Sequence, residues 1–125
     1  MNIPANLKYS EEHEWLKIEG NLAIVGITDY AQSQLGDIVF VDIQTEGETL
    51  ERNEVFGAVE AVKTVADLFM PVSGTIEKWN ESLEAEPQKV NEDPYGAGWM
   101  VKIRMSDPHE AEELLNAEAY GKLIS

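Results

Sequence analysis

Residues 55–69 read Val-Phe-Gly-Ala-Val-Glu-Ala-Val-Lys-Thr-Val-Ala-Asp-Leu-Phe. This run is rich in valine and predicts two strands, Val55–Val62 and Val65–Phe69. Lys63 stands out in it, because lysine is disfavoured within strands. No Asn-Gly or Asp-Gly pair marks a turn here, so spacing alone favours an edge-strand lysine that blocks aggregation.

The segments on both sides of this run continue the strand pattern. They are short and are separated by turn formers such as Gly20, Gly47 and Gly74. Such spacing predicts a sandwich or a barrel-like all-β core. The further strands expected are Trp15–Ile18, Leu22–Ile27, Asp37–Gln44, Thr75–Trp79 and Trp99–Met105.

Signals for helices are fewer. Thr28 is a suitable N-cap for a short helix through Leu35, and Gly36 is a suitable C-terminal stop. Near the C-terminus, Asp107 and Glu110 resemble the two ends of a capping box. The apolar face of a helix that starts there would be formed by Ala111, Leu114 and Leu115.

No linker or change in composition divides the chain. We therefore expect a single domain over residues 1–125, with a β core at about 15–106 and a helical segment at about 107–122. Residues 91–99 are crowded with turn formers and are expected to form a surface connection. A chain of 125 residues is long enough to bury a core without disulfides or metals.

The chain is strongly acidic and lacks cysteine. Nine Lys and Arg against 24 Asp and Glu give a net charge of −15, which argues against nucleic acid as a partner and suits basic proteins. Without cysteine, disulfides, thiolate metal sites and cysteine nucleophiles are excluded. Residues 1–8 resemble neither a signal nor a transit peptide, and no apolar run is long enough to span a bilayer. We therefore expect a cytoplasmic protein with no membrane partner.

Residues for catalysis by the chain itself are sparse. It has two histidines, His13 and His109, and neither a phosphate-binding glycine loop nor a serine nucleophile motif. Glu11-Glu12-His13-Glu14 offers metal-ligand types, but in so acidic a chain the stretch is better interpreted as a solvated strand start. The sequence thus predicts neither a catalytic centre nor a metal site.

Several blocks resemble the glycine cleavage system H-protein family. Glu60-Ala61-Val62-Lys63 is similar to the family's E-S-V-K motif, whose lysine carries lipoate in amide linkage, with Ala61 replacing the usual serine. Gly47 and Gly74 lie 16 residues before and 11 residues after Lys63, as in lipoyl-attachment segments generally. The other matching blocks are His13–Trp15 and residues 25–31, 35–41, 71–74, 90–96 and 98–100.

The resemblance implies a mainly β fold, a barrel-sandwich hybrid of two small antiparallel sheets with short peripheral helices and a C-terminal helix. The modified lysine, here Lys63, would lie on an exposed hairpin tip and carry lipoate. Glu60, three residues before it, is a candidate recognition residue for the lipoylating enzymes. An equally open interpretation is that Glu60 is one more surface acid.

The resemblance also implies the activity, which is that of a carrier in glycine catabolism and not of an enzyme. The lipoyl arm takes an aminomethyl group from the pyridoxal-phosphate glycine decarboxylase, the P protein. It presents this group to the tetrahydrofolate-dependent aminomethyltransferase, the T protein. The FAD-containing dihydrolipoamide dehydrogenase, the L protein, then reoxidises the arm. We expect the carrier to be a monomer.

Three acids are candidates for a cleft that protects the loaded arm, because its cationic amine gains from a carboxylate and from exclusion of water. Glu12 and Glu14 share a strand face with Leu16, so we expect them at the rim of the apolar face. Asp67 follows Lys63 closely enough to flank the root of the arm. Glu14 ranks first because it lies within a matching block, although a solvated surface position is an alternative for all three acids.

Two other functions stay open on the sequence. A related H-like protein would use the same lysine to relay lipoyl groups to other enzymes. A plain β-rich interaction module would leave Lys63 unmodified. Biotin carriers are also similar in this segment, but they typically place methionine on both sides of the lysine, where this chain has Val62 and Thr64.

Overall fold

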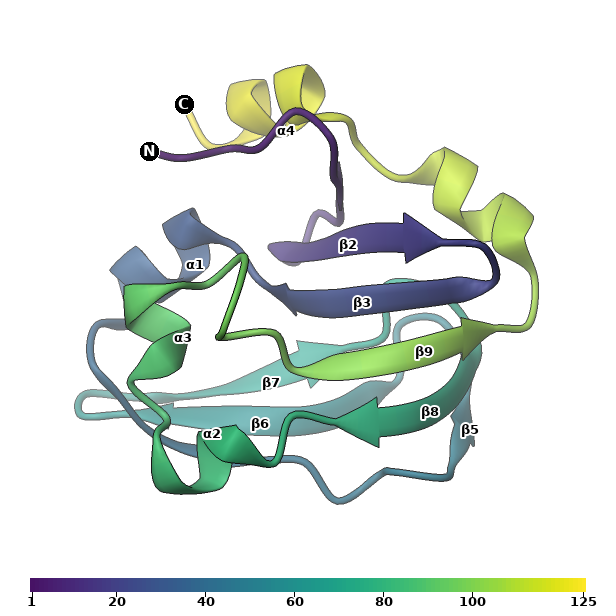
Figure 1. Cartoon of the computed structure of the whole chain (residues 1–125). Coiled ribbons are helices and arrows are strands. Elements are labelled where there is room, and N and C mark those ends of the chain that lie inside the picture. The colour runs from purple at the N-terminus through teal and green to yellow at the C-terminus, as the bar shows by residue number, and fades with distance from the viewer.

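The strands form two antiparallel sheets in the computed structural model, which describes all residues from Met1 to Ser125 (Figure 1). The larger sheet has six strands in the order β1-β2-β3-β9-β8-β5, and the smaller has three in the order β4-β6-β7. The strands are β1 Lys8–Tyr9, β2 Glu14–Glu19, β3 Leu22–Ile27, β4 Ile38–Asp42, β5 Thr49–Leu50, β6 Val55–Ala61, β7 Val65–Phe69, β8 Gly74–Trp79 and β9 Val101–Met105.

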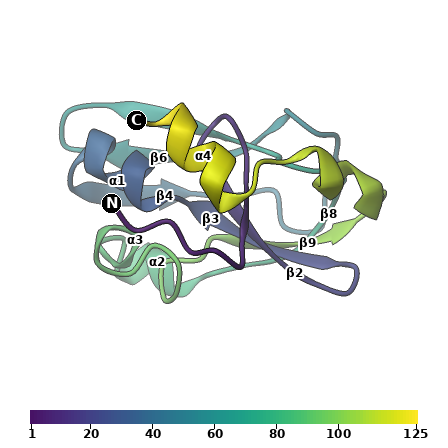
Figure 2. The same cartoon turned by 90° about the horizontal axis from the view of Figure 1, so that it is seen from above.

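Short helices lie around the two sheets, and the C-terminal one lies beside the N-terminal segment (Figure 2). They are α1 Asp29–Leu35, α2 Ser82–Ala85, α3 Lys89–Glu92, a 3₁₀ helix Pro108–Glu113 and α4 Ala117–Leu123. No helix is long and apolar enough to cross a membrane. The predicted mainly β fold with two antiparallel sheets, short helices and a C-terminal helix is confirmed, although neither sheet closes into a barrel.

The main core lies between the two sheets and contains 21 buried residues in one cluster. Side chains alternate along a strand, so each strand can turn one set of apolar residues inward. In the larger sheet, Ala23 pairs with Ile103 and Val25 with Val101, and all four are buried. The smaller sheet contributes Val41, Val59 and Leu68.

A second, smaller cluster lies between the larger sheet and the segment formed by the N-terminus and α4 (Figure 1). Trp15 packs over Gly26 of β3, where any Cβ would come within 2.8 Å of the indole Nε1. This contact requires glycine at that position. The buried members of the cluster are Leu7, Tyr9, Trp15 and Tyr120. Burial therefore extends on both sides of the segment 15–106 that was expected to hold the core.

Every strand expected from the sequence forms, with differences at the ends. β4 covers Ile38–Asp42 instead of Asp37–Gln44. β9 begins at Val101 and not at Trp99, because the Trp99 N–H closes a turn on the Gly96 carbonyl at 3.0 Å. The sequence does not predict β1, β5, α2 and α3, since elements of two to four residues show no periodicity.

The C-terminal segment differs from the expected helix. Asp107 does cap the N–H of His109 at 3.0 Å, but the turn that follows is a 3₁₀ helix. Leu114 and Leu115 do not lie on a helix face, because the Leu115 N–H and C=O pair with Tyr9 of β1 at 2.8 Å each. The carboxylate of Glu110 accepts from the N–H and hydroxyl of Ser73 instead of closing a capping box.

Candidate functional site

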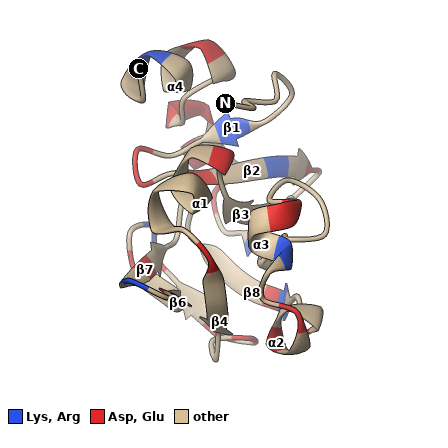
Figure 3. Cartoon of the chain, turned by 90° about the vertical axis from the view of Figure 1, so that its left-hand side faces the viewer, with Lys and Arg blue, Asp and Glu red and all other residues tan.

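Lys63 lies in the turn that joins β6 to β7. The last paired residues are Glu60 and Val65, and the Ala61 N–H donates to the Thr64 carbonyl at 2.7 Å. Val62 and Lys63 therefore occupy the two central positions of the turn, and residues 62–65 are all exposed. The interpretation of Lys63 as an edge-strand residue is wrong, and the hairpin tip implied by the family resemblance is correct. Figure 3 shows a basic position at the tip of this hairpin, and both acidic and basic positions on the other elements of this side.

The hairpin tip is held against the C-terminal end of α1. The Val62 N–H donates to the Asp37 carbonyl at 3.1 Å. Gly36, with φ of 80°, ends α1, and a Cβ there would lie 3.8 Å from Lys63 Cε. Asn91 of α3 fixes this loop by donating to the Gly36 carbonyl at 2.9 Å and accepting from the Ile38 N–H at 2.8 Å. Asn91 lies within the expected surface connection and within a block that matches the family, and neither signal indicates these contacts.

A cleft of about 280 Å³ runs along α1 between this helix and the β6–β7 hairpin. Its walls are mainly apolar, with Tyr30, Ala31 and Leu35 from α1 and Val59, Ala66 and Leu68 from the hairpin. Lys63 lies near the C-terminal end of α1. At the other end of the helix, the Thr28 N–H donates to the His13 carbonyl at 3.0 Å, which brings the loop before β2 to the cleft.

Glu12, Glu14 and Asp67 all line this cleft. The structure thus brings together the three acids singled out from the sequence, although Asp67 lies more than fifty residues after Glu12 and Glu14. Glu12 and Asp67 are exposed, whereas Glu14 retains 1% of its accessible surface. Glu60 points elsewhere: it is exposed on β6 and pairs with Phe40 of β4 and Val65 of β7.

The expected positions of Glu12 and Glu14 need correction. Glu14 is the first residue of β2 and is buried at the cleft, not at a rim. Glu12 does not share its strand face, because residues 10–14 form a turn in which His13 has φ of 72°. The Ser10 N–H closes this turn on the Glu14 carbonyl at 2.9 Å. Nothing in the local sequence predicts a left-handed φ at a histidine, so this turn could not be expected from the sequence.

The Glu14 carboxyl is held by specific partners. Ser10 Oγ donates to Oε1 at 2.6 Å and accepts from the Glu14 N–H at 3.0 Å. The Phe69 N–H of β7 donates weakly to Oε2 at 3.4 Å. Burial raises the pKa of Glu14 to about 7, although these two hydrogen bonds act to lower the pKa. The group can therefore hold or release a proton near neutral pH.

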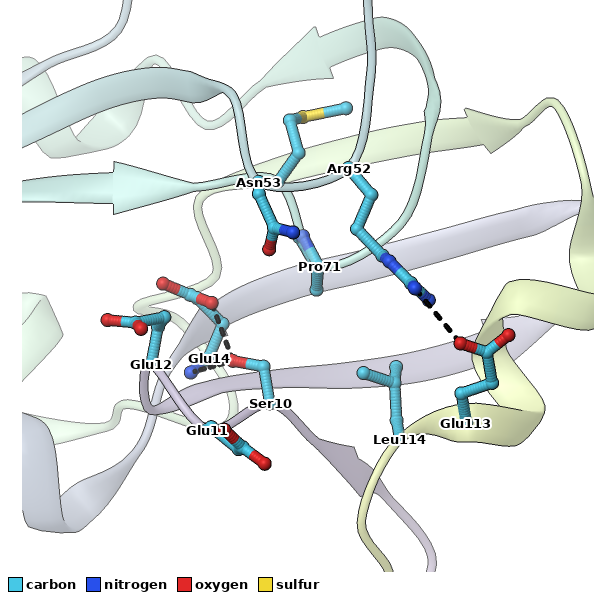
Figure 4. A pocket seen from close by; sticks show the side chains of 10 residues that line it. Ser10, Glu11, Glu12, Glu14, Arg52, Asn53, Pro71, Glu113 and Leu114 are labelled. Atoms are coloured by element: carbon cyan, nitrogen blue, oxygen red, sulfur yellow. Dashed lines mark hydrogen bonds and ion pairs between the residues drawn. The ribbon is translucent and has the colours of Figure 1, made fainter.

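A second hollow of about 230 Å³ shares Glu12 and Glu14 with the cleft (Figure 4). Its lining is mostly polar, and Arg52 reaches across it to Glu113 at 2.9 Å. In Figure 4 the Glu14 side chain lies against Ser10, between this hollow and the strands behind. No three His, Asp or Glu side chains converge closely enough to hold a metal ion.

Comparisons with known proteins agree over almost the whole chain. The profile of the family described as "Glycine cleavage H-protein" matches residues 7–125. The chain is 59% identical over 125 residues to the glycine cleavage system H protein of Bacteroides thetaiotaomicron, covering 100% of this chain and 99% of that protein. It is 56% identical over 125 residues to the one of Bacillus cytotoxicus, covering 100% and 98%.

A solved structure gives the same result for the fold. The crystal structure of a glycine cleavage system H protein from Mycobacterium marinum superposes with a TM-score of 0.87. The two chains are 39% identical, and the match covers 96% of this chain and 97% of the other.

Proposed function

The chain belongs to the glycine cleavage H-protein family, and from this premise we propose that Lys63 bears the lipoyl group and that the cleft along α1 shelters its cargo. The chain is a lipoyl carrier of the glycine cleavage system. One observation carries the proposal: an exposed lysine lies beside one end of an apolar cleft, and a buried carboxyl lies at the other end.

The surroundings of Lys63 suit an attached acyl group. Three lysines, Lys17, Lys89 and Lys122, form ion pairs, but Lys63 forms none, so its amine is free for acylation. Amide formation removes the positive charge, and the aliphatic chain can then lie against apolar walls. When bound, the lipoyl group supplies a disulfide that opens to take up the aminomethyl group and is later reformed by oxidation.

The cleft residues have two roles: the apolar ones exclude water, and the acidic ones supply negative charge. The apolar side chains of α1 and the hairpin keep water away from whatever lies between them. Glu14 is poised to lose its proton when a cation arrives, because a nearby opposite charge favours the ionised form of a carboxyl. Glu12 and Asp67, which are exposed at the same cleft, add negative charge near its opening.

The partners proposed are the P, T and L proteins and the lipoylating enzymes, with no catalytic step carried out by this chain. A net charge of −15 favours basic rims on such partners and association that weakens with salt. We place Glu60 at the contact with the lipoylating enzymes, since it is exposed on the same hairpin as Lys63. A chain without cysteine suits the cytoplasm, where we expect it to act as a single-domain monomer.

Lipoylation of defined variants tests the attachment site. The full chain is co-expressed with a lipoylating enzyme and its intact mass is measured. The parent should gain one lipoyl group, and Lys63→Arg should gain none because the acylable amine is lost. Lys78→Arg is the matched control, since Lys78 is also exposed and forms no ion pair, and it should be modified like the parent. Modification of Lys63→Arg would contradict the proposal.

Two alternatives predict different results. If the chain relays lipoyl groups to other enzymes, the lipoylated protein will not support glycine–bicarbonate exchange with the P protein. If it is an unmodified interaction module, Lys63 will stay unmodified in the protein isolated from its native source. The carrier proposal expects exchange activity and modification.

A further inference from the structure

The C-terminal helix places one buried hydroxyl between the turn at residues 10–14 and the N-terminal end of α1, which meet at one end of the cleft. Tyr120 of α4 has no accessible surface, and its ring stacks on Tyr9 with centroids 4.7 Å apart. Its hydroxyl oxygen lies 2.7 Å from Thr28 Oγ1 and 2.9 Å from His13 Nδ1. These two partners are 92 and 107 residues away in the sequence, so only the fold brings them together.

The first partner fixes the direction of α1. Thr28 is the N-cap of this helix, and its Oγ1 accepts from the Ala31 N–H at 3.1 Å. Helix α1 supplies Tyr30, Ala31 and Leu35 to one wall of the cleft. Loss of the Thr28 hydroxyl would therefore destabilise the first turn of that wall.

The second partner belongs to the turn that carries Glu14. His13 lines the cleft, and its ring centroid lies 5.1 Å from that of Tyr30. Its φ of 72° is a conformation that residues other than glycine adopt only when their surroundings hold them there. The hydrogen bond between His13 Nδ1 and the Tyr120 hydroxyl ties the His13 side chain to a residue outside the turn.

We propose that Tyr120 is a positioning residue of the cleft, whose hydroxyl ties the turn at residues 10–14 to the N-terminal end of α1. The purpose of this tie rests on the proposed function: it holds one end of the cleft in place, so that water is excluded from the cargo there. The geometry itself belongs to the unmodified chain. The C-terminal helix thus contributes to the cleft without lining it.

The chain offers a matched control in the same cluster. Tyr9 is as fully buried as Tyr120, and the two rings stack on each other. The Tyr9 hydroxyl, however, donates to the Pro4 carbonyl and forms no hydrogen bond with a cleft residue. Tyr9→Phe and Tyr120→Phe each remove one buried hydroxyl and keep the ring. A general loss of packing would affect both variants alike, whereas a positioning role belongs to Tyr120 alone. Thr28→Ser keeps the hydroxyl that Tyr120 contacts and should behave like the parent.

The first readout uses the unmodified protein. Ring ¹³C and ¹⁵N chemical shifts of His13 report the hydrogen bond at Nδ1. We expect them to change in Tyr120→Phe and to stay at the parental values in Tyr9→Phe and Thr28→Ser. Unchanged His13 shifts in Tyr120→Phe, or equal changes in Tyr9→Phe, would overturn the inference.

The second readout uses the full chain lipoylated at Lys63, reduced, and loaded by incubation with formaldehyde and ammonium. Water then returns the cargo as formaldehyde and ammonium, and the sulfur regains its proton. Release should be about fivefold faster in Tyr120→Phe than in Tyr9→Phe, the factor that one ordinary hydrogen bond represents. Equal release rates in the two variants would overturn the inference. If the parent releases formaldehyde as fast as a short lipoyl-lysine peptide, the shelter proposal fails, and the His13 shifts alone decide the role of Tyr120.

Discussion

The turn at Val62–Lys63 and the turn at residues 10–14 both join antiparallel strands, yet their surroundings are opposite. At the first turn both side chains are exposed, and backbone hydrogen bonds of Ala61 and Val62 hold it in place. At the second turn Glu14 is buried, is bonded by Ser10 and follows a strained His13. The difference supports the proposal that the attachment point is left free to enter other active sites, while the shelter is fixed in advance.

The largest effect is expected when the amine of Lys63, the one reactive group of the turn at Val62–Lys63, is replaced. Lys63→Arg keeps the charge and should change the free energy of unfolding by less than about 0.5 kcal/mol, because the side chain is exposed. Carrier activity in glycine–bicarbonate exchange with the P protein should vanish. Thermal denaturation and the exchange assay measure the two quantities on the same preparation. Exchange above background in Lys63→Arg would contradict the role of Lys63 as the attachment point.

The second effect concerns the turn at residues 10–14, and it is a dependence of the free energy of unfolding on pH. Burial raises the pKa of Glu14 to about 7 from its usual 4.5, so the folded protein holds this proton more tightly than the unfolded chain. The stability that it contributes is complete below pH 4.5 and is lost as pH rises through 7. The free energy of unfolding of the parent should therefore fall, relative to Glu14→Gln, by up to about 3 kcal/mol between pH 4.5 and pH 8.

Urea denaturation of both proteins at several pH values measures this difference. His13 is present in both, and burial lowers its pKa, so its own loss of stability toward acid cancels in the comparison. A parallel pH dependence in the two proteins would show that Glu14 is not a buried acid with a raised pKa.

The third effect is the lifetime of the loaded arm. Glu14→Gln should leave lipoylation intact and shorten that lifetime at least about tenfold, the lower range for a lost charge-assisted hydrogen bond. Glu12→Gln is the control from the same turn and should have a smaller effect, because Glu12 is exposed. Formaldehyde release from the loaded variants gives the rates, and equal rates for parent and Glu14→Gln would remove Glu14 from the shelter.

The smallest effect is expected at Glu60, which lies on β6 just before the turn at Val62–Lys63. Glu60→Ala should slow lipoylation roughly threefold, as expected for an exposed charge at a contact, with little change in melting temperature. Initial rates of lipoylation at limiting enzyme test this. A melting temperature that falls while the rate stays the same would instead assign Glu60 a structural part in the β6–β7 hairpin.

The strands and α1 could be predicted because their signals are local. β3 and β9 carry inward-facing valine and isoleucine, and Thr28 and Gly36 mark the ends of α1 as ordinary caps. The conformation of the C-terminal segment could not be predicted, because Leu115 pairs with Tyr9 from the other end of the chain. Such pairing satisfies backbone groups that a helix would otherwise satisfy, and local sequence does not reveal it.

The candidate site divides in the same way. The resemblance to H proteins pointed to Lys63 and ranked Glu14 first among the acids, whereas spacing alone placed Lys63 wrongly within an edge strand. Ser10 and Tyr120 carried no local signal, because their importance depends on hydrogen bonds to Glu14 and His13 that exist only in the folded chain. Residues that position other residues are therefore found from the structure and not from motifs.

Chemical-shift mapping tests most directly whether the two turns work together. Backbone amide signals are compared between the unmodified protein and the protein lipoylated, reduced and loaded with the aminomethyl group. The account predicts changes along the cleft, at Ala31, Leu35, Val59 and Ala66, and at Glu14 at its far end. Changes confined to residues 62–65 would mean that the arm stays at the hairpin tip, and they would contradict the account.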